Sequence, residues 1–269
     1  MKIYETNHYF LRIYQVYILV TIFLFFGCNT APECKGNKIS KRPIIAFNDT
    51  FNISASAIKL KTNADTSYLE YVFKEYDLID IQSLDTSIKV DLKYASTDNF
   101  LKLNIYDGLR KAYFPCDVAI RICNAQFYLK QLYPNYSLII FDASRPLHVQ
   151  QMMWDSLDMP PNIKYAYLSP PFAISLHNYG CALDVSIIDN STHKLLEMGS
   201  EFDFFGKLSQ PVYEWQFLKS GELTQEAFEN RKLLRKVMQN AKFFPITSEW
   251  WHFNYCNKEF AAAKYKLIK

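Results

Sequence analysis

The spacing of apolar residues predicts a chain in which helices and strands follow one another without a fixed rhythm. Apolar side chains recur at helical spacing in three segments, over residues 118–133, 146–157 and 224–241. Four other segments show the alternation or the short apolar run of a strand, over residues 88–94, 138–141, 182–188 and 250–255. Because these elements do not form repeated strand–helix–strand units, the pattern predicts an α+β fold. We expect a mainly antiparallel central sheet flanked by helices.

The first 28 residues have the pattern of a targeting segment. Lys2 and Arg12 precede an apolar run from Ile13 to Phe26, which ends at Gly27-Cys28. The run is shorter than the roughly 20 residues of a membrane-spanning helix, so it is typical of a secretion signal. Its end resembles a bacterial lipoprotein box, in which Cys28 carries lipid. This predicts an exported lipoprotein, periplasmic or in the cell envelope. The alternatives are a secreted protein and an uncleaved N-terminal membrane anchor.

The remaining chain divides by composition into a tether and one domain. Residues 29–65 are rich in Lys, Asn, Ser and Thr and lack sustained apolar periodicity, which is typical of a tether. An ordered strand near residues 44–47 is the alternative. Residues 66–269 have the length of a single domain. The whole chain is 49% hydrophobic with a net charge of +3, so it lacks the excess of basic residues typical of a nucleic-acid-binding protein.

Two short segments contain the residue types of a hydrolytic zinc site. His177 and Asp184 bracket the passage from a loop into the strand over 182–188, and such a loop–strand corner can bring both side chains to one metal ion. Glu249 and His252 are three residues apart, so on a regular strand they would face opposite sides. The chain must therefore bend between them if both are to reach one site. Taken alone, each segment is also explained by a structural role.

A third candidate is Arg145, which follows the strand over 138–141 and precedes Pro146. An arginine held at a strand end can direct its planar guanidinium into a cleft. There it would stabilise the oxyanion that forms when water attacks a carbonyl group. The spacing is equally compatible with a salt bridge between Arg145 and Asp142.

Together these segments resemble the zinc D-alanyl-D-alanine dipeptidases, the family of the vancomycin-resistance dipeptidase. The shared motifs are S-x-H-x-x-G-x-A-x-D at 175–184, E-W-W-H at 249–252 and S-R-P at 144–146. Residues 93–100 and 198–204 resemble two further motifs of the family, K-Y-A-T-x-x-N-F and M-G-S-x-F-D-F. The resemblance covers about residues 80–256. Tyr179 and Cys181 depart from it, since the family has Arg and Ser at these positions.

The resemblance implies a role for each candidate residue. One zinc ion per chain would be held by His177, Asp184 and His252. Glu249 would be the general base, and Arg145 would stabilise the tetrahedral intermediate. The residues implied in substrate binding are Ser175 and Asp203, on the free ammonium group, and Tyr94, in the pocket lining.

The implied activity is hydrolysis of D-Ala-D-Ala or a related D,D-dipeptide. Because the predicted signal places the enzyme outside the cytoplasm, we expect a role in cell-wall peptide turnover. The nearest alternative is a D,D- or L,D-carboxypeptidase that acts on longer peptidoglycan peptides. A zinc-stabilised, non-catalytic binding lipoprotein is the alternative from another class, although a purely structural zinc site has no need of the base Glu249.

Overall fold

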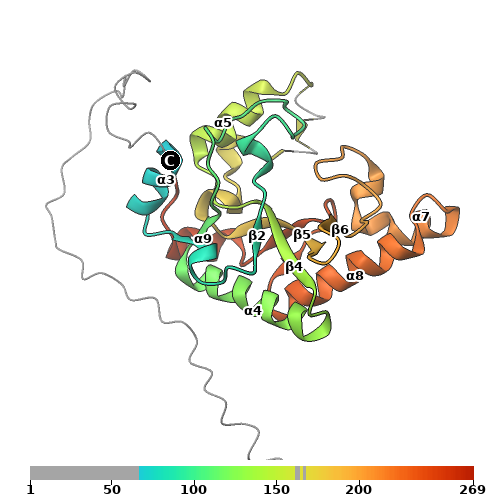
Figure 1. Ribbon diagram of the computed structural model, residues 1–269. Coiled ribbons are helices and arrows are strands. Elements are labelled where there is room, and N and C mark those ends of the chain that lie inside the picture. The colour runs from blue at the N-terminus through green and yellow to red at the C-terminus, as the bar shows by residue number, and fades with distance from the viewer. Residues whose placement is uncertain (1–66, 161–163, 166–167) are drawn as a thin grey trace, which may run out of the picture. The chain divides into compact units, whose positions relative to one another are not determined.

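Six strands form one sheet in the computed structural model, which describes residues 67–160, 164–165 and 168–269 (Figure 1). The strand order is β2-β4-β5-β8-β7, and β6 pairs with β5. The strands are β2 (Lys89–Val90), β4 (Tyr136–Asp142), β5 (Ala182–Asp189), β6 (Lys194–Leu195), β7 (Phe244–Pro245) and β8 (His252–Asn254). A separate antiparallel pair joins β1 (Ile79–Asp80) to β3 (Tyr113–Phe114).

The predicted α+β class is confirmed, but the central sheet is mixed. Strand β2 runs parallel to β4, whereas the pairings β4–β5, β5–β6, β5–β8 and β7–β8 are antiparallel. A parallel pair needs a long crossover, and the segment between β2 and β4 provides one because it contains helix α4 (Cys116–Leu132). The alternation over residues 88–94 indicated a strand but carried no information on its direction.

Helices cover the sheet and supply much of the core. The α-helices are α3 (Tyr68–Glu75), α4, α5 (Leu147–Ser156), α7 (Glu214–Ser220), α8 (Gln225–Asn240) and α9 (Lys258–Lys264). Helices α4 and α8 contact each other and lie below the sheet in Figure 1. Thr224 caps α8, since its hydroxyl oxygen accepts the N–H of Ala227 at 3.1 Å. Ile122, Val185 and Leu234 are fully buried between these layers.

The three predicted helices are present with ends close to those expected, but two predicted strands are shorter. Strand β2 stops at Val90, and residues Lys93–Ala95 form a 3-10 turn instead. The carbonyl of Tyr94 accepts the N–H groups of Ile105 and Tyr106, so local contacts replace sheet pairing at this position. Strand β8 begins only at His252.

The predicted signal segment, Cys28 and the tether lie outside the described residues. Within the part of the chain that the structure describes, no helix has the length and apolar character needed to cross a membrane.

Candidate active site

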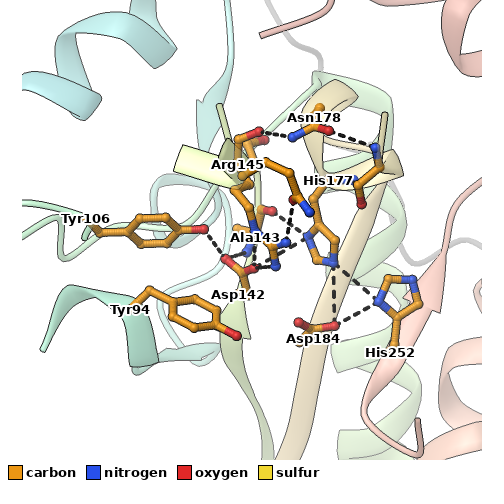
Figure 2. A network of polar contacts seen from close by, with 12 residues as sticks. Tyr94, Tyr106, Asp142, Ala143, Arg145, His177, Asn178, Asp184 and His252 are labelled. Atoms are coloured by element: carbon orange, nitrogen blue, oxygen red, sulfur yellow. Dashed lines mark hydrogen bonds and ion pairs between the residues drawn. The ribbon is translucent and has the colours of Figure 1, made fainter. Parts of the chain in front are cut away.

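Two neighbouring strands and one short helical turn bring the predicted metal ligands together. Asp184, the third residue of β5, lies opposite His252, the first residue of β8, in the antiparallel pairing of these strands. His177 lies on the 3-10 turn Leu176–Tyr179 that leads into β5. One ligand atom from each of the three side chains lies within 4.8 Å of the others. Figure 2 shows the three side chains converging.

Gly180 allows the sharp entry from this turn into β5. Its φ of 66° lies in the left-handed region that glycine adopts without strain. A Cβ atom there would lie 2.6 Å from Pro115 Cδ and 2.6 Å from Ser144 Oγ. The close approach of these neighbours holds His177 against the end of β4.

Hydrogen bonds determine which nitrogen of each histidine faces the centre. The Nδ1–H of His177 donates to the carbonyl of Ala143 at 2.8 Å, which leaves Nε2 with its lone pair. The Nε2–H of His252 donates to Asn254 Oδ1 at 2.8 Å, which leaves Nδ1 for the centre. His252 Nδ1 lies 2.9 Å from Asp184 Oδ1 and 3.3 Å from His177 Nε2. Three electron-pair donors therefore meet, and this two-imidazole, one-carboxylate set fits a zinc ion with an open coordination position.

Charge at the centre supports the same conclusion. Burial opposes ionisation of Asp184, but the two histidines outweigh it and hold the pKa of this carboxyl well below its usual range. Burial also opposes protonation of His252. Without a bound cation, the hydrogen bond and charge of Asp184, together with Glu249 and Asn254, raise the pKa of His252 to about 9. The site therefore attracts positive charge, either as a proton or as a metal ion.

Glu249 lies beside this centre in the bend that precedes β8. Its Oε2 is 3.9 Å from His252 Nδ1. The backbone N–H of Trp250 donates to Ser209 rather than to the sheet, so the chain turns between Glu249 and His252 as the two roles require. Burial raises the pKa of the half-buried Glu249 carboxyl, which brings it closer to the value suited to a general base near neutral pH.

Arg145 both lines the cavity and forms a salt bridge, so the two possibilities raised by its spacing coexist. Its guanidinium donates to Asp142 Oδ2 through Nε at 3.0 Å and also through Nη2. Its Nη1 donates to Gln150 Oε1 at 2.7 Å. Asp142 is fully buried at the end of β4 and also accepts the hydroxyl of Tyr106 (Figure 2). This network fixes the guanidinium beside the metal ligands.

The predicted substrate-binding residues line the same cavity, which has a volume of about 280 Å³. The hydroxyl of Tyr94 donates to Asp203 Oδ2 at 2.8 Å. Burial raises the pKa of the Asp203 carboxyl well above its usual range. Ser175 Oγ accepts the N–H of His177 at 3.3 Å and so caps the helical turn that carries this ligand.

Two non-glycine residues, Asp203 itself and Ile174 beside Ser175, have a positive backbone φ angle. Asp203 has a φ of 60°, and Ile174, which directly precedes Ser175, has a φ of 46°. Such conformations are uncommon, and for a β-branched residue like Ile174 they are true outliers. They persist where the surrounding structure holds them, and they cluster at functional sites.

Sequence reasoning missed several polar residues of this cavity and its support. Asp142 was considered only as a salt-bridge partner, although its place directly after the strand over 138–141 was a signal. Asn254 is two residues from His252 on a strand, and this spacing puts both side chains on one face. No sequence pattern pointed to the other polar residues of the cavity and its support, which are Tyr106, Gln150 and Lys258.

Comparison with known proteins shows the family to which this chain is related. The sequence profile of peptidase family M15, described as D-Ala-D-Ala dipeptidase, matches residues 74–268. The D-alanyl-D-alanine dipeptidase of Escherichia coli (strain K12) is 29% identical over 192 residues, which cover 71% of this chain and 89% of that protein. The enzyme of the same name from Enterococcus faecalis is 30% identical over 181 residues, covering 62% and 85%. With most of its described residues inside the family match, the chain belongs to the M15 D-Ala-D-Ala dipeptidase family of metal-dependent peptidases.

Proposed function

We propose that this protein is a zinc-dependent dipeptidase that hydrolyses D-Ala-D-Ala or a closely related D,D-dipeptide. The observation that carries the proposal is one cavity that contains the triad His177, Asp184 and His252, the carboxylate Glu249 and the carboxylate Asp203. The relatives' names support the substrate, since each is called a D-alanyl-D-alanine dipeptidase. They do not favour the carboxypeptidase alternative.

The triad would hold one zinc ion, which supplies Lewis-acid chemistry by lowering the pKa of water and polarising a carbonyl group. Glu249, next to His252 Nδ1, accepts the proton of the attacking water and then delivers it to the departing amine. Arg145 contributes fixed N–H donors where negative charge develops on the carbonyl oxygen. Because Asp142 and Gln150 already hold the guanidinium, it needs little reorganisation during the reaction.

Asp203 would recognise the free amino group of the substrate. Its carboxyl group lies in the cavity with the Tyr94 hydroxyl on one oxygen. An arriving ammonium group favours the charged carboxylate and offsets the cost of its burial. An acylated or longer peptide has no charge to place there and would leave Asp203 without an ionic partner. This explains how the cavity can reject peptides that are acylated or extended at the N-terminus.

The location of the enzyme follows from the predicted signal and from Cys28 as a lipid-bearing residue. An enzyme anchored to the outer side of a membrane meets dipeptides released from the wall rather than dipeptides awaiting incorporation. We therefore place its role in cell-wall peptide turnover. Finding the activity in the cytoplasmic fraction, on a chain with an uncleaved N-terminus, would contradict this placement.

A substrate panel tests the proposed function. D-alanine release from D-Ala-D-Ala is expected to exceed release from N-acetyl-D-Ala-D-Ala by about a hundredfold, because acylation removes a charge-assisted hydrogen bond worth roughly 1.5–3 kcal/mol and adds bulk. L-Ala-L-Ala serves as the stereochemical control. Cleavage of a wall pentapeptide as fast as the dipeptide would instead support the carboxypeptidase.

A further inference from the structure

We infer that Lys258 binds the C-terminal carboxylate of the substrate and thereby makes a free C-terminus part of the enzyme's specificity. This inference rests on the proposed dipeptidase function. A dipeptide is a zwitterion with an ammonium group at one end and a carboxylate at the other. Asp203 accounts for the ammonium end only. The cavity therefore needs a cation for the other end.

Among the described residues that line the cavity, one cationic side chain has no carboxylate partner and is available to bind the substrate carboxylate. The cationic side chains among the described lining residues, histidines apart, are Arg145 and Lys258. Asp142 already neutralises Arg145, whose third nitrogen donates to Gln150. Among the residues that the structure describes, no carboxylate lies within 4.0 Å of the Lys258 ammonium.

The ammonium group of Lys258 is positioned but not saturated. Its Nζ donates to the carbonyl of Ala173 at 2.9 Å. An ammonium group has three N–H donors, so two remain for a ligand. Ala173 ends the 3-10 turn Pro171–Ala173, two residues before Ser175, so the same contact ties Lys258 to the loop that enters the cavity.

The position of Lys258 also gives the cavity a polarity that matches a zwitterion. In Figure 2, Tyr94, whose hydroxyl donates to Asp203, lies to the left of Asp184, and His252 lies to its right. The Nε2 edge of His252 points away from the triad to Asn254, and both Asn254 and Lys258 line the cavity. Lys258 is the first residue of α9, four positions beyond Asn254. The cavity therefore offers the carboxyl group of Asp203 and the ammonium group of Lys258 to the two charged ends of a zwitterion.

Paired substrates with and without a C-terminal charge test this inference. The substrates are D-Ala-D-Ala and its C-terminal amide, D-Ala-D-Ala-NH2. The full chain loaded with zinc is expected to prefer the free acid by about tenfold in kcat/KM, since a charge-assisted contact at an exposed lysine is worth about one order of magnitude. Lys258→Gln keeps a donor for Ala173 but removes the charge. It should lose this preference through a higher KM for the acid, with the amide unaffected.

Matched variants distinguish a role of Lys258 in binding the substrate from a role in supporting the loop that contains Ala173. Lys258→Arg should retain most of the preference, and Lys219→Gln, on the exposed side of α7, should retain all of it. Zinc content should be the same in every variant. An equal loss of kcat/KM on both substrates in Lys258→Gln would overturn the inference in favour of a structural role, and so would no loss on either. If the wild-type chain cleaves neither substrate, the proposed function fails first and the inference falls with it.

Discussion

Replacing Glu249 by glutamine is expected to lower kcat for D-Ala-D-Ala by about a thousandfold while the zinc content stays at one ion per chain. Glutamine has nearly the same shape but cannot accept the proton of the attacking water. Glu249 is not one of the three convergent ligands, although its Oε2 lies only 3.9 Å from His252 Nδ1. Catalysis and metal binding should therefore separate in this variant. Steady-state kinetics and metal analysis on the same preparation measure both.

The control for this variant is Glu226→Gln, because Glu226 is exposed on α8 outside the cavity. It should behave as the wild type in both measurements. Turnover of Glu249→Gln near the wild-type rate would refute the role of Glu249 as the base. Loss of zinc together with activity would instead make Glu249 a determinant of metal binding.

Replacing Asp142 is expected to lower the free energy of unfolding by a large amount. Asp142 supports the site without being one of its predicted metal ligands. Its carboxylate is completely buried and accepts from the Arg145 guanidinium, the Tyr106 hydroxyl and the backbone N–H of Ala143. Asp142→Ala leaves the buried guanidinium of Arg145 without its counter-charge. Breaking a buried pair in this way costs about 3–5 kcal/mol, so the free energy of unfolding should fall by that amount in urea titrations.

An exposed ion pair provides the comparison. Lys232 and Glu229 are 2.9 Å apart on the surface of α8, with half of each side chain accessible to solvent. Lys232→Ala should change the free energy of unfolding by less than about 1 kcal/mol. If Asp142→Ala lowers the free energy of unfolding no more than Lys232→Ala does, the hydrogen-bond network around Arg145 does not stabilise the fold as proposed.

The sequence predicted those parts of the fold that depend on local patterns. The helix over 224–241 is capped by its own Thr224 and buries its apolar stripe, so spacing alone was sufficient to predict it. The direction of β2 and its early end at Val90 depend on a crossover through α4 and on contacts of Tyr94 with Ile105 and Tyr106. Such long-range partners leave no periodic signal in the residues themselves.

The same distinction applies to the site. His177, Asp184, Glu249 and His252 occupy recognisable motifs, and the structure brings their side chains together. The groups that orient them come from other parts of the chain. Ala143 offers a backbone carbonyl, and Tyr106 meets Asp142 across 36 positions of sequence, so neither could be recognised before the fold was known.

If His177, Asp184 and His252 hold a zinc ion that hydrolysis of D-Ala-D-Ala requires, removing the metal must abolish the activity. The most direct measurement is D-alanine release from D-Ala-D-Ala by the full chain, first stripped of metal with a chelator and then titrated with zinc. The stripped protein should release no D-alanine, and activity should rise with added zinc until it saturates at one ion per chain. Activity that survives complete removal of the metal, or protein with one bound zinc ion that releases no D-alanine, would contradict it.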